Sequence, residues 1–192
     1  MKSGLLVILV QVFIGLSRSD ETDEDCSPQI AERCFKYTWP EIYSGKGENY
    51  ICGAINDDIL CAQDIIDDGC RKDQGRDNFD SWISGLAAVY SFFCNDQRYR
   101  LLHDLLQSVE PHGNCFNLTS FVSCVESKTK VTHVTDMLYV TMDAVECNWI
   151  MISFATCGSR VGSTECLHVQ EIISEALQVF FQEAGCANII QL

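Results

Sequence analysis

The stretch DNFDSWISGLAAVYSFFC, which spans residues 77–94, carries apolar side chains at the period of an α-helix. One face of such a helix would hold Phe79, Trp82, Ile83, Leu86, Tyr90 and Phe93. Either Asp77 or Asn78 can cap its N-terminus, because both side chains accept hydrogen bonds from free backbone N–H groups. The stretch therefore predicts an amphipathic helix.

The helical period recurs on both sides of this stretch. Further helices are predicted at residues 26–34, 59–66, 101–109 and 134–158. A last helix is predicted to begin at Ser163 or Thr164 and to stop at Gly185. Residues 35–50 are predicted to be a loop, because a proline and two glycines there would break a helix. Strand patterns are sparse, so we predict an all-α fold.

The chain has 12 cysteines, and they fall into two sets of six. The first set is Cys26, Cys34, Cys52, Cys61, Cys70 and Cys94, and the second is Cys115, Cys124, Cys147, Cys157, Cys166 and Cys186. Short and long steps follow in the same order in both sets, which indicates an internal duplication, with coincidence as the alternative. We therefore predict two related six-cysteine helical units, residues 20–110 and 111–192, packed either separately or as one domain.

An even number of cysteines in an exported chain is typical of disulfide bonds, and we expect six of them. Two cysteines nine residues apart on one helix would lie about 13 Å apart along its axis, whereas a disulfide needs Cα atoms within about 7 Å. Cys52 therefore cannot bond to Cys61 if one helix carries both, and the same holds for Cys147 and Cys157. Such cysteines should bond to neighbouring helices and so staple a helical bundle.

The N-terminus has the three parts of a secretory signal peptide. Lys2 is followed by an apolar run at residues 5–16 and then by Ser17-Arg18-Ser19, with small residues where a signal peptidase needs them. The run is shorter than the roughly 20 residues of a membrane span, and no later apolar stretch is longer. We predict a signal peptide at residues 1–19, no membrane span, and a secreted, extracellular chain.

The chain is strongly acidic, with 27 acidic and 13 basic residues and a net charge of −14. Removal of the signal peptide would take away Lys2 and Arg18 and lower the net charge to −16. Nucleic acid and anionic membranes bind clustered Lys and Arg, so the composition argues against both as partners. It is typical of a highly soluble extracellular protein, or of one whose partner is cationic.

Few residues carry the chemistry of a recognisable site. Asn117-Leu118-Thr119 is an N-glycosylation sequon, so Asn117 is a predicted glycosylation site, and an unused triplet is the alternative. The four histidines are not spaced for a metal or a catalytic motif. The aspartates at positions 73, 77 and 80 outline a calcium loop only loosely, because the ligand spacing of an EF-hand is missing. We expect no catalytic, cofactor-binding or metal-binding residues, and no enzyme.

The predicted signal peptide and the cysteine spacing across residues 26–186 resemble those of exported cysteine-rich helical proteins of arthropods and nematodes, the hemolymph glycoprotein-like families. The resemblance implies an extracellular helical protein. It includes no functional motif, so it assigns no site residue. Insect odorant-binding proteins are a further comparison, but their cysteine pattern includes a C-x-x-x-C step that neither set contains.

Two functions fit this sequence. The first is a non-enzymatic binding or structural protein whose partner is an unknown extracellular protein. The alternative is a carrier of a small hydrophobic ligand, since helices stapled by disulfides can enclose a pocket that some of the ten phenylalanines would line. A closed apolar cavity would favour the carrier, and a filled core with an exposed apolar patch would favour surface binding.

Overall fold

The computed structural model describes residues 28–35, 48–70, 76–95, 99–108, 116–131, 134–161 and 167–186. Their elements, in chain order, are η1 (Pro28–Ala31), α2 (Glu32–Phe35), α4 (Glu48–Gly69), α5 (Asp77–Cys94), α6 (Tyr99–Ser108), α7 (Leu118–Thr129), η2 (Val134–Tyr139), α8 (Ala144–Val161) and α9 (Leu167–Glu183), where η marks a 3-10 helix. These segments contain helices and no strand element, and disulfides join them. The predicted all-α, disulfide-stapled fold is confirmed.

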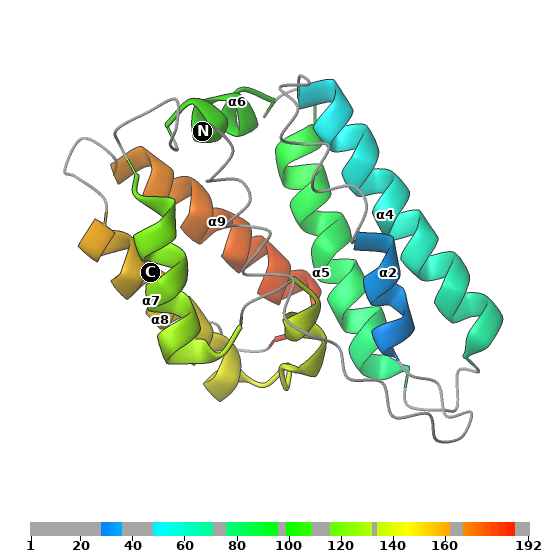
Figure 1. Ribbon diagram of the computed structural model, residues 1–192. Helices are drawn as coiled ribbons and strands as arrows, with labels where there is room; N and C mark the ends of the chain where they lie inside the picture. The colour runs from blue at the N-terminus through cyan, green and yellow to red at the C-terminus, as the bar shows by residue number, and fades with distance from the viewer. Residues whose placement is uncertain are drawn as a thin grey trace.

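Helices α4 and α5 lie side by side, and α2 packs against α4 (Figure 1). Aromatic side chains fill the space between these helices, and Trp82 is fully buried there. The indole of Trp82 meets the ring of Phe35 edge-on at a centroid distance of 5.3 Å, and its centroid lies 5.8 Å from that of Phe79. The apolar face predicted for residues 77–94 is confirmed at Phe79, Trp82 and Ile83, which are all buried.

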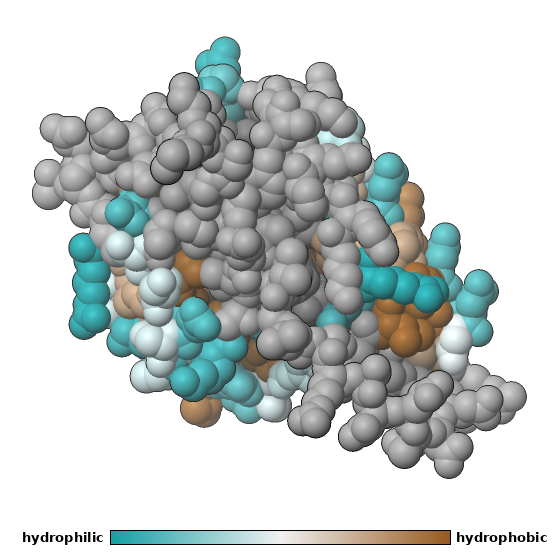
Figure 2. Space-filling view, in the orientation of Figure 1, coloured by the Kyte–Doolittle hydropathy of each residue, from teal (hydrophilic) through white to brown (hydrophobic). Residues whose placement is uncertain are grey.

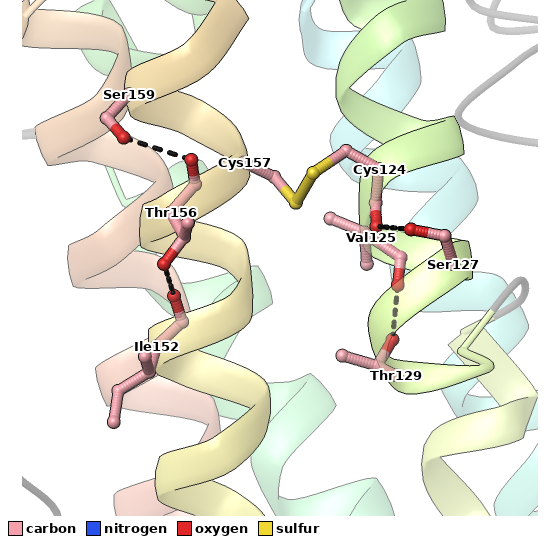
Figure 3. The surroundings of a disulfide bond; sticks show 8 residues. All are labelled: Cys124, Val125, Ser127, Thr129, Ile152, Thr156, Cys157 and Ser159. Atoms are coloured by element: carbon pink, nitrogen blue, oxygen red, sulfur yellow. Dashed lines mark hydrogen bonds between the residues drawn. A yellow bond between two sulfur atoms is a disulfide. The ribbon is translucent and has the colours of Figure 1, made fainter.

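Helices α7, α8 and α9 form a second group, in which α8 contacts both α7 and α9. A disulfide joins Cys124 on α7 to Cys157 on α8 (Figure 3). Beside this bond, the hydroxyls of Ser127 and Thr156 each donate to a carbonyl of their own helix. Because these hydroxyls are satisfied within their own helices, they do not bridge α7 to α8. Apolar packing and the disulfide hold these two helices together.

Helix α5 of the first group packs along α9 of the second (Figure 1). At their contact, a Cβ added to Gly85 would lie 2.8 Å from the ring of Phe180 and 2.8 Å from its backbone oxygen. The ring of Phe180 is itself buried and packs edge-on against Phe181, with centroids 5.2 Å apart. Position 85 therefore needs a glycine, because any side chain would force the two helices apart.

One buried cluster connects the two groups of helices. It contains Phe79 and Trp82 of α5 together with Ile150, Met151 and Phe181 of α8 and α9. A smaller cluster lies between α7, α8 and α9 and is made of Phe116, Phe121, Val122, Val125, Cys157 and Val169. Residues from both predicted units thus share the main core.

The described disulfides have Cα–Cα distances between 5.7 and 6.6 Å and are Cys34–Cys61, Cys52–Cys94, Cys124–Cys157 and Cys147–Cys186. In each set of six, the second cysteine bonds to the fourth and the third to the sixth. Cys70 is also disulfide-bonded, while Cys26, Cys115 and Cys166 lie outside the described residues. The repeated pairing supports the predicted duplication, which stays a prediction.

The geometric argument about paired cysteines on one helix is confirmed. Helix α4 carries both Cys52 and Cys61, and α8 carries both Cys147 and Cys157. None of these four bonds to the other cysteine on its own helix. Each instead reaches a residue outside that helix, so the disulfides fasten neighbouring elements together.

Several predicted boundaries are wrong. Helix α4 begins inside the predicted loop at residues 35–50 and is longer than the helix predicted at 59–66, because its apolar positions continue back to the buried Ile51. The predicted helix at 134–158 is two elements, η2 and α8. Asp143 starts the second, because its carboxylate accepts hydrogen bonds from the N–H groups of Val145 at 2.8 Å and Glu146 at 2.9 Å.

The helix ends also differ from the prediction in part. Arg76, rather than Asp77 or Asn78, is the N-cap of α5, and it makes no side-chain capping bond. The predicted start of the last helix at residues 163–164 lies outside the described residues. Its predicted stop is confirmed, because Gly185 has a left-handed φ of 84° and the next N–H, that of Cys186, bonds back to the carbonyl of Phe181.

None of the described helices is both long and apolar enough to cross a membrane. On the face drawn in Figure 2, hydrophobic and hydrophilic residues are both visible around the residues drawn in grey.

The close packing of α5 on α9 can be tested with a pair of glycine substitutions. Gly85→Ala is expected to lower the free energy of unfolding by about 1–3 kcal/mol, because overpacking outweighs the gain of about 1 kcal/mol from replacing a helical glycine. Gly53→Ala in α4 is the matched control, since no atom lies within 4 Å of its added Cβ. That control should gain about 0.5–1 kcal/mol. Urea unfolding measures both, and an undiminished stability of Gly85→Ala would contradict the argument.

The predicted duplication makes a second measurable claim. If each unit holds three bonds of its own, the first cysteine of each set should bond to the fifth, which gives Cys26–Cys70 and Cys115–Cys166. Proteolysis without reduction, followed by mass spectrometry of the linked peptides, identifies these pairs. A bond between the two sets, such as one from Cys70 to Cys115, would rule out two self-contained units.

Candidate functional site

A half-open groove of about 500 Å³ runs between α8 and α9 and reaches Phe121 of α7. Its apolar walls are buried or half-buried and comprise Phe121, Met151, Phe154, Ile173 and Leu177. Glu171 and Glu175 also line the groove, and because both are exposed they stand at its mouth. The volume lies within the range of roughly 300–1,000 Å³ that small-molecule sites occupy.

Two small residues that line this groove correspond, by position relative to the cysteines, to large residues of the first set. Ala155 has the same position relative to the fourth cysteine of its set as Ile59 has in the first set. Relative to the sixth cysteine, Ser174 has the same position as Trp82. Ala155 and Ser174 line the groove, whereas Ile59 and Trp82 are buried in the main core. Loss of a large side chain leaves a cavity unless neighbours move into the space.

The same comparison accounts for the acidic mouth of the groove. Counting from the sixth cysteine pairs Glu171 with Phe79 and Glu175 with Ile83. Phe79 and Ile83 are buried on α5, but both glutamates are exposed on α9. One face of α5 is thus apolar and packed, while the corresponding face of α9 is polar and borders an open space.

The polar groups at the groove are amides, a hydroxyl and carboxylates. Its apolar walls are bordered by the amides of Gln170 and Gln178, the hydroxyl of Ser174 and the two carboxylates. Among its described lining residues there is no His, Lys, Arg or Cys.

Asn117, the predicted glycosylation site, is exposed and is the N-cap of α7. Its side-chain oxygen accepts a hydrogen bond from the N–H of Ser120 at 2.8 Å. A glycan would be attached through the side-chain nitrogen, so capping and glycosylation use different atoms of the same amide. The two roles are compatible, and glycosylation stays a prediction.

One aspartate of the loosely outlined calcium loop, Asp80, is engaged in an ion pair. Arg76 donates to a carboxylate oxygen of Asp80 at 2.9 Å and also pairs with Asp67 near the end of α4. The hydrogen bond with Asp80, followed by that with Asp67, raises the pKa of the Arg76 guanidinium above its ordinary value. Asp73 lies outside the described residues. No group of three or more potential metal ligands occurs in the part of the chain that the structure describes.

A second candidate surface lies on the outward face of α8. Val145, Trp149 and Ile152 follow one another at helical spacing and are 82%, 53% and 40% exposed. The opposite face of the same helix is buried through Cys147, Ile150 and Met151. A helix that is apolar on both faces is usually buried on both faces, so this exposed row could serve to bind another molecule.

Sequence analysis predicted that the cysteines form disulfides, but it did not predict the groove. Each residue of the groove looks ordinary by itself, because apolar and polar residues alternate along any amphipathic helix. The signal was present in the comparison of the two units. When the sets are aligned by their last cysteine, Trp82 corresponds to Ser174 and Phe79 to Glu171. A core position that is small or charged in the other set indicates a changed role.

The role of Asn117 can be separated into its two parts by substitution. Asn117→Asp should keep the cap and remove the glycan, whereas Asn117→Ala should remove both and cost about 1 kcal/mol of stability. Urea unfolding and the mass of the protein secreted from eukaryotic cells measure the two effects. An unchanged mass in Asn117→Asp would show that the sequon is unused.

No protein-family model, curated protein or solved structure matches this chain. The resemblance to exported cysteine-rich helical proteins of arthropods and nematodes therefore stays a prediction. Function has to be inferred from the groove, from the residues that line it and from the charge of the chain.

Proposed function

We propose that this chain is a secreted, non-enzymatic binding protein that carries a small hydrophobic ligand in the groove between α8 and α9. The observation that carries the proposal is the groove itself, whose walls are apolar and lie open between α8 and α9. Ser174 and Ala155 stand where the first unit has Trp82 and Ile59, and the apolar walls between them remain open. A ligand would supply the buried apolar contacts that these positions no longer make.

The disulfides support an extracellular place of action. Disulfides persist in oxidising compartments and are rare in the cytosol, and all the described cysteines are bonded. The predicted signal peptide gives the same location independently. Cross-links between helices also suit a carrier, because they hold the walls of an empty groove in place before a ligand arrives.

A second candidate function is the binding of an extracellular protein through the exposed row on α8. It is favoured by the exposure of Val145, Trp149 and Ile152. Native mass spectrometry of the protein isolated from its source fluid separates the candidates. A retained small molecule supports the carrier, whereas a retained protein chain with no small molecule supports surface binding.

Refilling the groove tests the carrier directly. The double variant Ala155→Ile with Ser174→Trp restores the side chains of the first unit and should abolish binding of the neutral fluorescent probe N-phenyl-1-naphthylamine. The probe's emission on titration measures binding, and far-ultraviolet circular dichroism checks the fold.

Ser159→Trp is the matched control for this experiment, because Ser159 is exposed and is not among the described residues that line the groove. It should bind the probe as the unchanged protein does. Equal binding by the folded double variant would place the probe elsewhere and refute the groove as the site. No binding by the unchanged protein would likewise refute it.

A further inference from the structure

We infer that the ligand of this groove is a cationic amphiphile, whose apolar tail lies between α8 and α9 and whose amine sits beside Glu171 and Glu175. This inference rests on the proposed function and adds the chemical class of the ligand. It depends on the charged residues that line the groove, on the residues that correspond to them in the first unit and on the net charge of the chain.

The charged residues among the described lining of the groove are all of one sign. Glu171 and Glu175 lie one helical turn apart on α9 and both line the opening. Gln170 and Gln178 add neutral amides, and no described lining residue is basic. A ligand with a carboxylate or phosphate would meet repulsion here, while an amine would be attracted to the carboxylate of Glu171.

Packing alone does not account for these carboxylates. The corresponding residues of the first unit are Phe79 and Ile83, which are buried, so the helix can carry apolar side chains at both positions. The walls of the groove are apolar at Met151, Phe154 and Leu177. An apolar pocket with a few polar groups fixes the orientation of a ligand that has an apolar and a polar part. We therefore place the apolar tail against these walls and the amine beside the glutamates.

The net charge of the chain acts in the same direction. At −14 it attracts cations from a distance and raises their local concentration near a cleft of the same sign. Long-range attraction would act on any cation and would not distinguish the groove from other surfaces. The test must therefore separate the local effect of Glu171 from the effect of net charge.

Three probes with the same tail make this separation possible: dodecylamine, dodecanol and dodecanoate, each used below its aggregation concentration at pH 7. Binding is measured by competition with N-phenyl-1-naphthylamine. Dodecylamine should bind most tightly and dodecanoate most weakly, and the preference should shrink at high salt because the carboxylates are exposed.

Glu171→Gln should weaken dodecylamine binding by about threefold to fivefold, as expected for one exposed charge pair, and leave dodecanol unchanged. Glu171 is substituted because Glu175 also interacts elsewhere in the protein. Glu183→Gln is the matched control, since Glu183 is an exposed residue of α9 that is not among the described lining residues. It changes the net charge by the same amount and should leave dodecylamine binding nearly unchanged.

Each result decides between distinct conclusions. Binding of all three probes with equal affinity would keep the carrier and overturn the cationic preference. An amine preference that Glu183→Gln weakens as much as Glu171→Gln does would also overturn it, because net charge would then be the cause. Failure of all three probes to bind would overturn the proposed carrier itself, and the inference with it.

Discussion

The contact between α5 and α9 at Gly85 and Phe180 positions the rest of the molecule. Each described disulfide joins cysteines of the same set, so none of these bonds fixes one predicted unit to the other. The two central helices are instead held by packing, and the missing side chain at position 85 lets their backbones approach. Because α5 carries Trp82 and α9 carries Ser174, the same contact places a filled core on one side and an open groove on the other.

Much of this arrangement could be predicted from the sequence, because it depends on local periodicity and simple lengths. The face of α5 follows from apolar residues at helical spacing, and the reach of a disulfide excludes a Cys52–Cys61 bond once one helix carries both. The break before α8 was missed because Asp143 acts through hydrogen bonds to its own backbone, which interrupt an otherwise apolar period. The groove was missed because an unfilled volume depends on two helices at once, and no single stretch of sequence records it.

Disulfides fasten the elements that border the groove. In the second unit, the bonds Cys124–Cys157 and Cys147–Cys186 span 33 and 39 residues. Cross-links over loops of this length stabilise a fold by about 4 kcal/mol each in the chain-entropy model. These bonds therefore help to hold the helices beside the groove in place.

The open lining of the groove also affects which substitutions this protein can tolerate during evolution. Ala155, Ser174 and Glu171 border free space, so substitutions there meet solvent or ligand instead of tightly packed neighbours. Most substitutions in a packed core destabilise the fold, and selection removes those that fall below the threshold for function. Residues at the groove are spared that constraint, while Gly85 and Trp82 remain under it. Under the proposed function, related chains could therefore diverge in ligand preference while keeping the same helical frame.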